Sequence, residues 1–424
     1  MKYFLIVTFI LINCVVFAQA AFQDFFVDKQ MRLDYFHSGN SENDYYTFDE
    51  VIEEPFWGGS KTKLIDKLNY GNFMFYVYDM KTDSLIYSRG YSSLFKEWQT
   101  TEEAKKINRT FAETLTFPYP KDSVRVEIYD RDKTNKFRKR VEFIIDPQDY
   151  FIKKEQLNKT KTTRIHYSGN PNEKLDIVFI AEGYTTDEID KFEKDAKRFS
   201  NYLFEYSPYK EMKDKINIWG VKTVSESSGT DIPADSVWKS TAVNSSFYTL
   251  DSERYLMTTD YKIVRNYAAN VPYDQIYILV NTSKYGGGAI YNYYSCTAVD
   301  NEKSKKIFIH EFGHGFAGLA DEYYTSEVSY QDFFNLDVEP WEPNITTLVD
   351  FESKWKDMLD PDTPIPTSVE GKEPLQLGVY EGGGYVAKGV YRPSPNSLMK
   401  AFDIDEFNEV SKRAIKRVIE FYCE

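Results

Sequence analysis

FIHEFGHGFAGLADEYY, residues 308–324, is the stretch that decides the fold of the second half of this chain. Two of the four histidines of the protein, His310 and His314, lie here, and Glu311 directly follows the first. Side chains four residues apart share one face of an α-helix, so both imidazoles can point at a single metal ion. Glu311 lies about 100° further round the helix, where its carboxylate can reach a water molecule on that ion. The stretch therefore predicts a catalytic metal site on a helix.

The alternative interpretation is an ordinary core helix that contains two hydrogen-bonded histidines. Two features favour the metal site. Half of the histidines of the chain are concentrated at this place. Gly313 and Gly315 each cost a helix about 1 kcal/mol relative to alanine, so we expect that close packing beside the site is what requires them.

Acidic side chains that follow the helix supply a third ligand. We expect Gly318 to end the helix, after which the chain can turn back and present Asp321 or Glu322 to the ion. Metzincin metalloproteases use the similar pattern H-E-x-x-H-x-x-G-x-x-H/D, and the spacing here is one residue longer. We favour Asp321 and keep Glu322 as the alternative. The carboxylate that does not bind metal would orient a histidine.

Zinc is the metal that this arrangement favours. Zinc held by three protein ligands keeps a position for water and lowers the pKa of that water towards about 7. Glu311 would accept the proton of the water and give it to the leaving amine. We expect one catalytic zinc ion, with His310, His314 and Asp321 as ligands and Glu311 as the catalytic base.

The segment YRPSPNSLMK, residues 391–400, is similar to the methionine turn of metzincins. Met399 follows a proline-rich turn and precedes the C-terminal helix, which is the order found in that group. A methionine in this position would pack under the metal ligands without touching the ion.

The pattern upstream of the site predicts an α/β fold over residues 156–424. Residues 175–184 are a nearly continuous apolar run, as in a strand covered on both faces. Residues 185–205 have helical spacing with Thr186 as the expected N-cap. The remaining expected elements are strands at 216–226, 275–281 and 289–299, and helices at 251–269 and 408–422. We interpret this order as a metzincin-like catalytic domain with a mixed twisted sheet, in which residues 286–294 form the edge strand where substrate can add as a further strand.

Residues 21–155 predict a separate all-β domain. Residues 73–80 and 84–91 flank a short turn, and residues 122–130 and 137–146 alternate apolar and charged side chains around another. Such alternation indicates half-buried antiparallel strands joined by hairpins. We expect a β-sandwich-like accessory domain, which would position substrate or bind a surface or glycan partner.

Residues 1–20 read as a signal peptide. Lys2 is followed by an apolar run, and residues 18–20 have the small-x-small form of a cleavage site. A membrane anchor is the alternative, but about 14 apolar residues are short for a span that needs about 20; a lipidated Cys14 is a weaker one. No later stretch of the sequence is long and apolar enough to cross a membrane. We therefore expect a secreted, periplasmic or cell-surface protein.

Composition narrows the function classes further. The net charge of −14 argues against nucleic acid as a partner, because phosphate binding needs a basic face. Cys296 and Cys423 are the cysteines that would remain after cleavage. They could form a disulfide in an oxidising compartment, or stay as unpaired buried thiols.

Several separated motifs together resemble one known family. The motifs are HEFGHGFAGLADEY, the upstream LDIVFIAEGYT, EPNIT at 342–346 and EGGGYVAKGVYRPSPNSLM at 381–399. Over about residues 165–424 the chain resembles the IgA-peptidase family of secreted bacterial metalloendopeptidases. The resemblance implies a zinc endopeptidase with His310 and His314 as ligands, Glu311 as base and Asp321 as the third ligand. The immunoglobulin substrate of the member that gave the family its name does not transfer.

A tyrosine of residues 381–392 is expected to stabilise the oxyanion of the tetrahedral intermediate. Tyr391 and Tyr385 are the two candidates, on a segment that could form the opposite wall of the cleft.

The leading hypothesis is a secreted zinc endopeptidase acting on extracellular protein or peptide. The first alternative is a host-surface or glycan-binding module with a structural or degenerate metal site. A structural zinc is normally closed by four protein ligands, so a fourth ligand would favour that alternative, whereas the intact Glu311 favours the enzyme. A metal-dependent amidase acting on cell-wall peptide is a third hypothesis.

Overall fold

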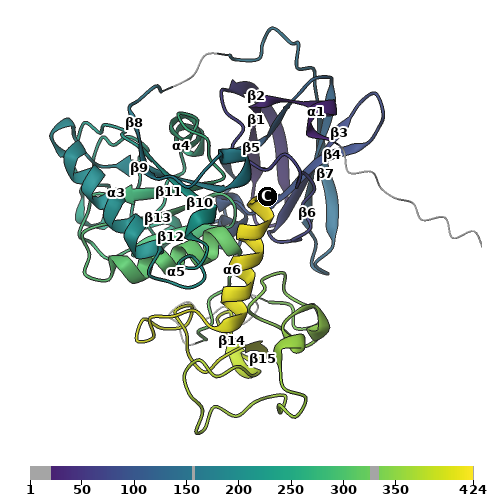
Figure 1. Cartoon of the computed structure of the whole chain (residues 1–424), viewed down its shortest axis with the longest axis vertical. Coiled ribbons are helices and arrows are strands. Elements are labelled where there is room, and N and C mark those ends of the chain that lie inside the picture. Colours follow the sequence, from purple (N-terminus) through teal and green to yellow (C-terminus); the bar gives the residue numbers. More distant parts are fainter. Residues whose placement is uncertain (1–20, 155–157, 325–333, 424) are drawn as a thin grey trace, which may run out of the picture.

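The computed structural model describes residues 21–154, 158–324 and 334–423. The expected signal peptide, residues 1–20, lies outside the described residues. Figure 1 shows three parts: a β-rich N-terminal region in purple and blue, a mixed sheet with helices in teal and green, and a smaller lobe built around β14 and β15. Helix α6 runs from this lobe to the place where the two larger parts meet.

The N-terminal region contains two antiparallel sheets. The first has the order β2–β1–β5 and consists of β1 (Phe26–Gly39), β2 (Asp44–Glu54) and β5 (Arg109–Pro120). The second has the order β4–β3–β6–β7 and consists of β3 (Phe73–Asp79), β4 (Leu85–Tyr91), β6 (Val124–Arg131) and β7 (Phe137–Ile145). Alternate side chains of both sheets, such as Leu33 and Val77, share one hydrophobic core. The expected hairpins are thus present, in a sandwich-like arrangement. Two short helices, α1 (Phe22–Phe25) and α2 (Leu94–Trp98), complete the region.

The larger sheet has six strands in the order β12–β13–β11–β9–β10–β8. Its four inner strands run parallel, and both edge strands run antiparallel to their neighbours. The inner strands are buried along their whole length, as parallel strands covered on both faces should be. The strands are β8 (Thr162–His166), β9 (Leu175–Glu182), β10 (Ile216–Val221), β11 (Gln275–Val280), β12 (Gly287–Ile290) and β13 (Tyr294–Ala298).

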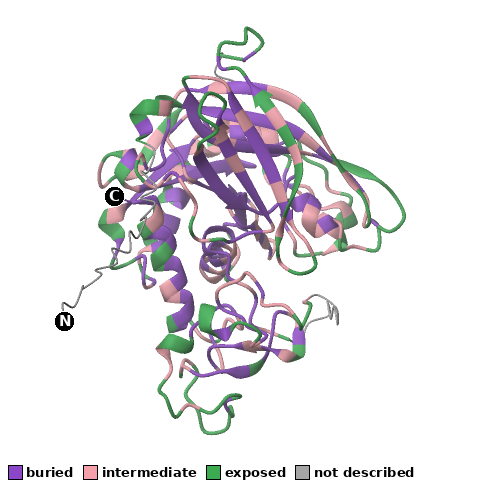
Figure 2. Ribbon diagram, turned by 90° about the vertical axis from the view of Figure 1, so that its right-hand side faces the viewer, coloured by how far each residue is buried: buried purple, intermediate pink, exposed green. Residues whose placement is uncertain are grey.

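Helices cover both faces of this sheet. One core contains Ile177 and Phe179 of β9 with side chains of α3 (Ile189–Leu203), α5 (Ser304–Ala317) and α6 (Glu409–Tyr422). The other core contains Val178 and Ile180 of β9 with side chains of α4 (Tyr261–Ala268) and of α2 from the N-terminal region. Figure 2 shows the resulting buried strands and the buried faces of the helices around them. The mixed α/β prediction is confirmed.

Four expected elements differ in detail. The strand predicted at 216–226 is β10, which ends at Val221. The strand predicted at 289–299 is wrong, because the chain reverses at Asn292, which has a positive φ, and forms the β12–β13 hairpin instead. The helix predicted at 251–269 is shortened to α4, because residues 254–256 pair with the β12 edge. The expected N-cap is one residue off, since Thr185 makes the capping box with Glu188.

The C-terminal helix agrees with the prediction. Asn408 accepts a hydrogen bond from the Ser411 N–H and caps α6. The adjacent hairpin consists of β14 (Tyr380–Gly383) and β15 (Val386–Arg392). Cys296 and Cys423 are both buried and unpaired, so the thiol interpretation holds and the disulfide does not.

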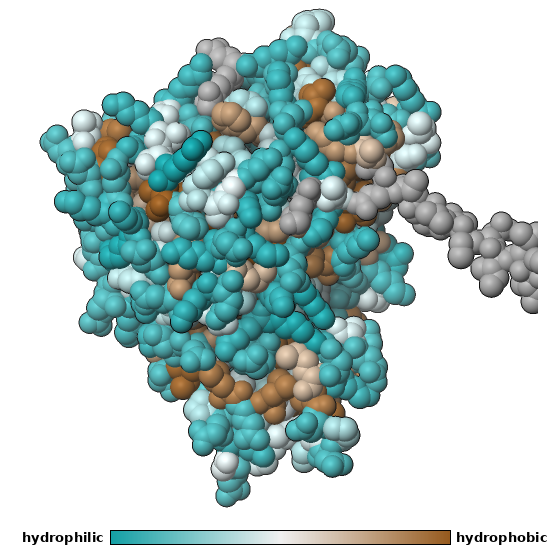
Figure 3. Space-filling model, viewed as in Figure 1, coloured by the Kyte–Doolittle hydropathy of each residue, from teal (hydrophilic) through white to brown (hydrophobic). Residues whose placement is uncertain are grey.

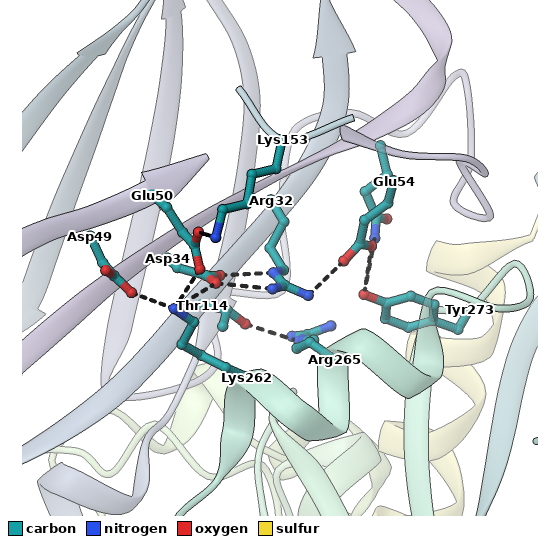
Figure 4. Close-up of polar contacts among 11 residues, drawn as sticks. Arg32, Asp34, Asp49, Glu50, Glu54, Thr114, Lys153, Lys262, Arg265 and Tyr273 are labelled. Atoms are coloured by element: carbon teal, nitrogen blue, oxygen red, sulfur yellow. Dashed lines mark hydrogen bonds and ion pairs between the residues drawn. The ribbon is translucent and has the colours of Figure 1, made fainter. Parts of the chain in front are cut away.

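The N-terminal region is fixed to α4 by polar side chains (Figure 4). The Arg265 guanidinium donates to Thr114 of β5 at 3.0 Å. The Lys262 ammonium donates to Asp49 at 2.5 Å and to Glu50 at 2.6 Å. Together with Asp34 these two carboxylates could surround a cation, and here Lys262 supplies the positive charge.

The surface in Figure 3 is mostly hydrophilic, with apolar patches in the lower part of the view. Among the described residues, none of the helices has the length and apolar character that crossing a membrane requires.

Candidate metal centre

Helix α5 is buried almost all round and opens to solvent at one turn. Its core face packs on the mixed sheet through Phe308, Phe312 and other apolar side chains. His310, Glu311 and His314 are only partly buried, although most of their neighbours on the helix are buried. The helix ends at Gly318, as expected. This residue has a φ of +62°, and the N–H groups of Gly318 and Leu319 return to the carbonyls of His314 and Gly313.

The chain beyond Gly318 brings Asp321 to the two histidines. The Nε2 atoms of His310 and His314 are 3.1 Å apart. Asp321 Oδ1 lies 3.2 Å from the first and 3.3 Å from the second. Three metal-binding atoms therefore form a nearly equilateral triangle.

Backbone carbonyls orient both imidazole rings. Nδ1 of His310 lies 3.1 Å from the Leu398 carbonyl oxygen, and Nδ1 of His314 lies 2.5 Å from the Leu319 carbonyl oxygen. A carbonyl oxygen can only accept, so Nδ1 carries the proton in each ring. In the neutral form of each ring, Nε2 therefore keeps a lone pair that is directed at the triangle, and this is the form that binds a metal.

The triangle fits a tetrahedral zinc ion. Ligand atoms about 2.0 Å from such an ion lie about 3.3 Å from one another, close to the three distances observed. Asp321 Oδ1 is buried and has no hydrogen-bond partner among the described residues, and a buried oxygen of this kind calls for a cation. The side chains are 12%, 19% and 6% exposed for His310, His314 and Asp321, so one side of the site stays open.

The charges of the site act strongly on one another. Burial alone would raise the pKa of Asp321, but the two histidines lower it well below its usual value. Burial alone would lower the pKa of His314, but Asp321 raises it to about 9. Burial raises the pKa of Glu311, and the histidine charges oppose that shift. Glu311 is therefore a carboxylate whose affinity for a proton is increased, as a general base requires.

The helix glycines allow close approach on two sides. A Cβ at Gly315 would lie 2.2 Å from Ser295 Oγ of β13. A Cβ at Gly313 would lie 3.0 Å from the sulfur of Met399. Close packing is thus the reason for both glycines, and it brings Met399 directly against the turn of α5 that carries the histidines.

Comparison with known families now identifies the chain. The family model described as IgA Peptidase M64 matches residues 163–373 and 368–419. The model described as Peptidase M64 N-terminus matches residues 21–142. The chain belongs to the IgA peptidase M64 family. A search of curated proteins finds no match.

Membership of the M64 family confirms the resemblance deduced from the motifs. It makes the chain a peptidase of a metallopeptidase family, whose substrates are proteins. The group formed by His310, His314 and Asp321 is a metal-binding arrangement of the described residues that fits this class.

Glu322, the alternative third ligand, has a different environment from Asp321. Its carboxylate accepts hydrogen bonds from Ser397 Oγ at 2.6 Å, from Asn344 at 2.9 Å and from Asn408 at 2.8 and 3.1 Å. Its backbone N–H donates to the Met399 carbonyl. Glu322 therefore joins the 397–399 turn to the start of α6, and it does not orient a histidine as the sequence suggested.

The two candidate tyrosines lie in different places. Tyr391 of β15 packs against a small core that contains Phe351 and Trp355, and its backbone pairs with Thr346. The structure places its side chain in that core and does not bring it to the metal-binding group. The Tyr385 hydroxyl donates to Asp321 Oδ2. This tyrosine sits at the turn of the hairpin with a φ of +65°.

Two groups of the site were missed from the sequence, the Leu319 and Leu398 carbonyls that orient the histidines. Main-chain oxygens carry no residue-type signal, so the motif could not reveal them. The glycine run at 382–384 was the signal that could have favoured Tyr385 over Tyr391. Gly382 and Gly384 have φ values of +94° and +55°, which favour glycine, and they form the turn that carries Tyr385.

Proposed function

We propose that the protein is a secreted zinc endopeptidase that hydrolyses peptide bonds of extracellular proteins. The observation that carries the proposal is the triangle of two imidazole nitrogens and one carboxylate oxygen, with edges of 3.1 to 3.3 Å, on the helix turn that also holds Glu311. His310, His314 and Asp321 would hold the zinc ion.

Zinc bound there would supply Lewis acidity towards the substrate carbonyl and would lower the pKa of water. Glu311 would accept a proton from the attacking water on its carboxylate and would later give that proton to the leaving amine. The raised pKa of Glu311 suits both transfers, since the group must hold the proton between them. The Nδ1 hydrogen bonds of the histidines would keep both rings aligned throughout.

We assign the oxyanion contact to Tyr385 in preference to Tyr391. Tyr385 donates its hydroxyl hydrogen to Asp321, one of the residues that would hold the zinc ion, whereas Tyr391 packs in a separate small core. Rotation of this hydroxyl towards the substrate would provide a hydrogen-bond donor for the developing negative charge.

A closed structural zinc site is a weaker explanation. Such sites normally have four protein ligands. Among the described residues the group offers three donors, and Glu322 is engaged with Ser397, Asn344 and Asn408. A three-donor site that is partly open supports catalysis.

The metzincin-like plan is part of the proposal. Met399 packs against Gly313 beneath the histidines, and the carbonyl of Leu398 orients His310. Both contacts support a methionine turn in residues 391–400. We further propose a catalytic domain at 156–424 and an accessory domain at 21–155, a division that the two family matches support. Export is supported by the pattern of residues 1–20.

The test combines metal content with hydrolysis, using protein that spans residues 21–424. We expect about one zinc ion per chain and cleavage of an unstructured protein such as casein. EDTA should abolish cleavage, and zinc should restore it. Glu311→Ala should keep the zinc and lose about two to four decades of rate, while Asp321→Ala should lose zinc. Full hydrolysis by Glu311→Ala would contradict the role of Glu311, and a protein that binds no zinc would contradict the whole proposal.

A further inference from the structure

Within the described residues, the outer edge of β12 has a single open position for a substrate strand. In an antiparallel pair, alternate residues direct their N–H and C=O groups towards the partner strand and away from it. The Ala298 N–H donates to the Gly286 carbonyl, so Gly286, Gly288 and Ile290 face β13. Gly287 and Ala289 therefore face outward.

Both ends of this edge are already occupied. The Gly287 N–H donates to the Arg254 carbonyl, and the Gly287 carbonyl accepts from the Leu256 N–H. The Tyr291 carbonyl accepts from the N–H of Ser92 in the N-terminal region. Between them, the N–H and C=O of Ala289 have no hydrogen-bond partner in the described part of the chain. A substrate peptide can therefore form backbone hydrogen bonds with β12 at Ala289 alone. The sequence analysis expected such pairing along the whole of residues 286–294.

The two faces of β12 then determine where substrate side chains point. Ala289 faces α5, because its Cβ lies 3.4 Å from the position that a Cβ at Gly315 would take. A substrate residue paired with Ala289 would direct its side chain to the same face, towards the metal-binding group. The residues before and after it would direct theirs to the opposite face. That face carries the Tyr255 ring, which packs against Gly288.

Glu97 of α2 lies at the end of the Tyr255 side chain. Its carboxylate accepts the hydrogen bond of the Tyr255 hydroxyl. The side chain is half-buried, and no basic residue forms an ion pair with it among the residues that the structure describes. Burial raises the pKa of Glu97 to about 7, and the charges of His314 and Glu311 act on it. The Cγ of Glu311 lies 3.1 Å from the position that a Cβ at Gly287 would take, and Tyr255 packs on the next residue of β12. The Glu97 carboxylate, at the end of Tyr255, is therefore joined to the metal-binding group through this short strand, and it lacks a cation among the described residues.

We propose that Glu97 of the N-terminal region binds a lysine or arginine side chain of the substrate, one residue away from the residue that pairs with Ala289. The enzyme would then prefer basic residues close to the cleaved bond, and its N-terminal region would supply part of the substrate specificity. This inference rests on the proposed function of the same site. A half-buried carboxylate without a cation is the feature that a substrate ammonium or guanidinium group would satisfy.

The test uses a set of fluorescent peptides that carry lysine, glutamine or glutamate at each position from three before to three after the cleaved bond. For wild-type enzyme we expect kcat/KM to be about tenfold higher for lysine than for glutamine at one of these positions, the effect of one hydrogen bond to a charged group. Glu97→Gln should abolish this preference, so that kcat/KM for the lysine peptide falls to the value for the glutamine peptide. Glu97→Lys should reverse it in favour of glutamate. Glu102→Gln is the matched control, because Glu102 is an exposed carboxylate of the same region, paired only with Lys105, and it should change nothing.

A measurement of peptide binding makes the test independent of catalysis and of the folding of the Glu97 variants. Affinities of the same peptides for Glu311→Gln, measured by fluorescence anisotropy, should show the lysine preference without turnover. In wild-type enzyme the preference should also weaken with added salt, because salt screens partly exposed charges. Cleavage that is indifferent to lysine, or a preference that survives in Glu97→Gln, would overturn the inference and leave the peptidase assignment intact. Absence of all cleavage would instead refute the peptidase proposal, and the anisotropy measurement would still decide whether Glu97 selects a cation.

Discussion

The neighbouring residues Asp321 and Glu322 should respond in opposite ways to the same change, carboxylate to amide. Glu322 accepts four hydrogen bonds, and its two oxygens share them equally. In Glu322→Gln one oxygen becomes an amide nitrogen. The Ser397 hydroxyl can turn and accept from it, but the Asn408 amide would face it donor to donor.

The expected loss in the free energy of unfolding follows from these hydrogen bonds. Two hydrogen bonds to a charged acceptor are lost or inverted, which is worth about 3 to 6 kcal/mol. The amide carries no charge to desolvate, and burial raises the pKa of Glu322, so part of this loss is offset. We expect Glu322→Gln to lower the free energy of unfolding by about 2 kcal/mol, and zinc affinity to fall by less than about tenfold because the residue acts on the ligands only through the 397–399 turn.

Asp321→Asn should show the reverse pattern. The amide can keep the Tyr385 hydrogen bond, and its other atom replaces an oxygen that has no hydrogen-bond partner. At about pH 10, above the pKa of about 9 that Asp321 gives His314, the change removes no ion pair with that imidazole. There we expect the free energy of unfolding of the zinc-free protein to change by less than about 1 kcal/mol, because few hydrogen bonds change. Zinc affinity should fall by more than about a hundredfold, beyond the range for an outer partner of a ligand.

Urea unfolding in EDTA at about pH 10 and competition with a zinc-binding dye at neutral pH separate the two effects. The first measurement gives the stability of the metal-free chain, and the second gives zinc affinity. If Glu322→Gln loses zinc at unchanged stability while Asp321→Asn unfolds more easily, then Glu322 is the ligand and the assignment of the triangle is refuted.

Three further predictions concern packing, pH and processing. Gly315→Ala should destabilise the protein by about 1 to 2 kcal/mol, because overpacking outweighs the helix propensity of alanine. In a Ser295→Ala background, where the 2.2 Å contact is removed, the same change should become neutral or stabilising, and equal effects in both backgrounds would contradict the packing argument. Burial alone would lower the pKa of His37, but Glu113 and Asp44 raise it. Its stabilising contribution is thus present below about pH 6.5 and lost as the pH rises through the raised pKa, so wild type should lose more stability than His37→Gln between pH 6 and 8 in urea titrations; parallel profiles would argue against this ion pair. N-terminal sequencing of exported protein should begin directly after residue 20, and an intact N-terminus would count against the signal peptide.

The features that could be predicted from the sequence are local ones. The four-residue spacing of His310 and His314 and the stop at Gly318 depend on helix geometry alone, which is why the structure reproduces them. The apolar run at 175–184 and the alternating N-terminal hairpins depend on burial of one or both faces of a strand. For such elements, the spacing of residues in the sequence directly reflects the helix geometry or strand burial that produces the structure.

Features that depend on tertiary contacts could not be predicted in this way. Tyr385 and Tyr391 belong to the same hairpin, and positive φ values at its turn decide which hydroxyl reaches Asp321. Asp321 and Glu322 are adjacent, and their tasks differ because Asn344 and Asn408, from distant segments, surround only the second. The sequence predicted one strand in place of the β12–β13 hairpin, because Asn292 is the single polar residue of the turn and lies between Tyr291 and Tyr293.

The N-terminal region and the catalytic sheet share structure that a domain boundary near residue 155 does not suggest. Leu94, Phe95 and Trp98 of α2 belong to the same hydrophobic core as Val178 and Ile180 of β9. Removing residues 21–155 would strip side chains from that core and remove the Ser92 N–H that pairs with the Tyr291 carbonyl at the end of β12. More of this edge would then be unpaired, which promotes aggregation. The same arrangement lets α2 contribute to the substrate edge without touching the metal-binding group. On the proposal for Glu97, substitutions in α2 should change which peptides bind and leave α5 unchanged, which would place specificity and chemistry in different segments of the chain.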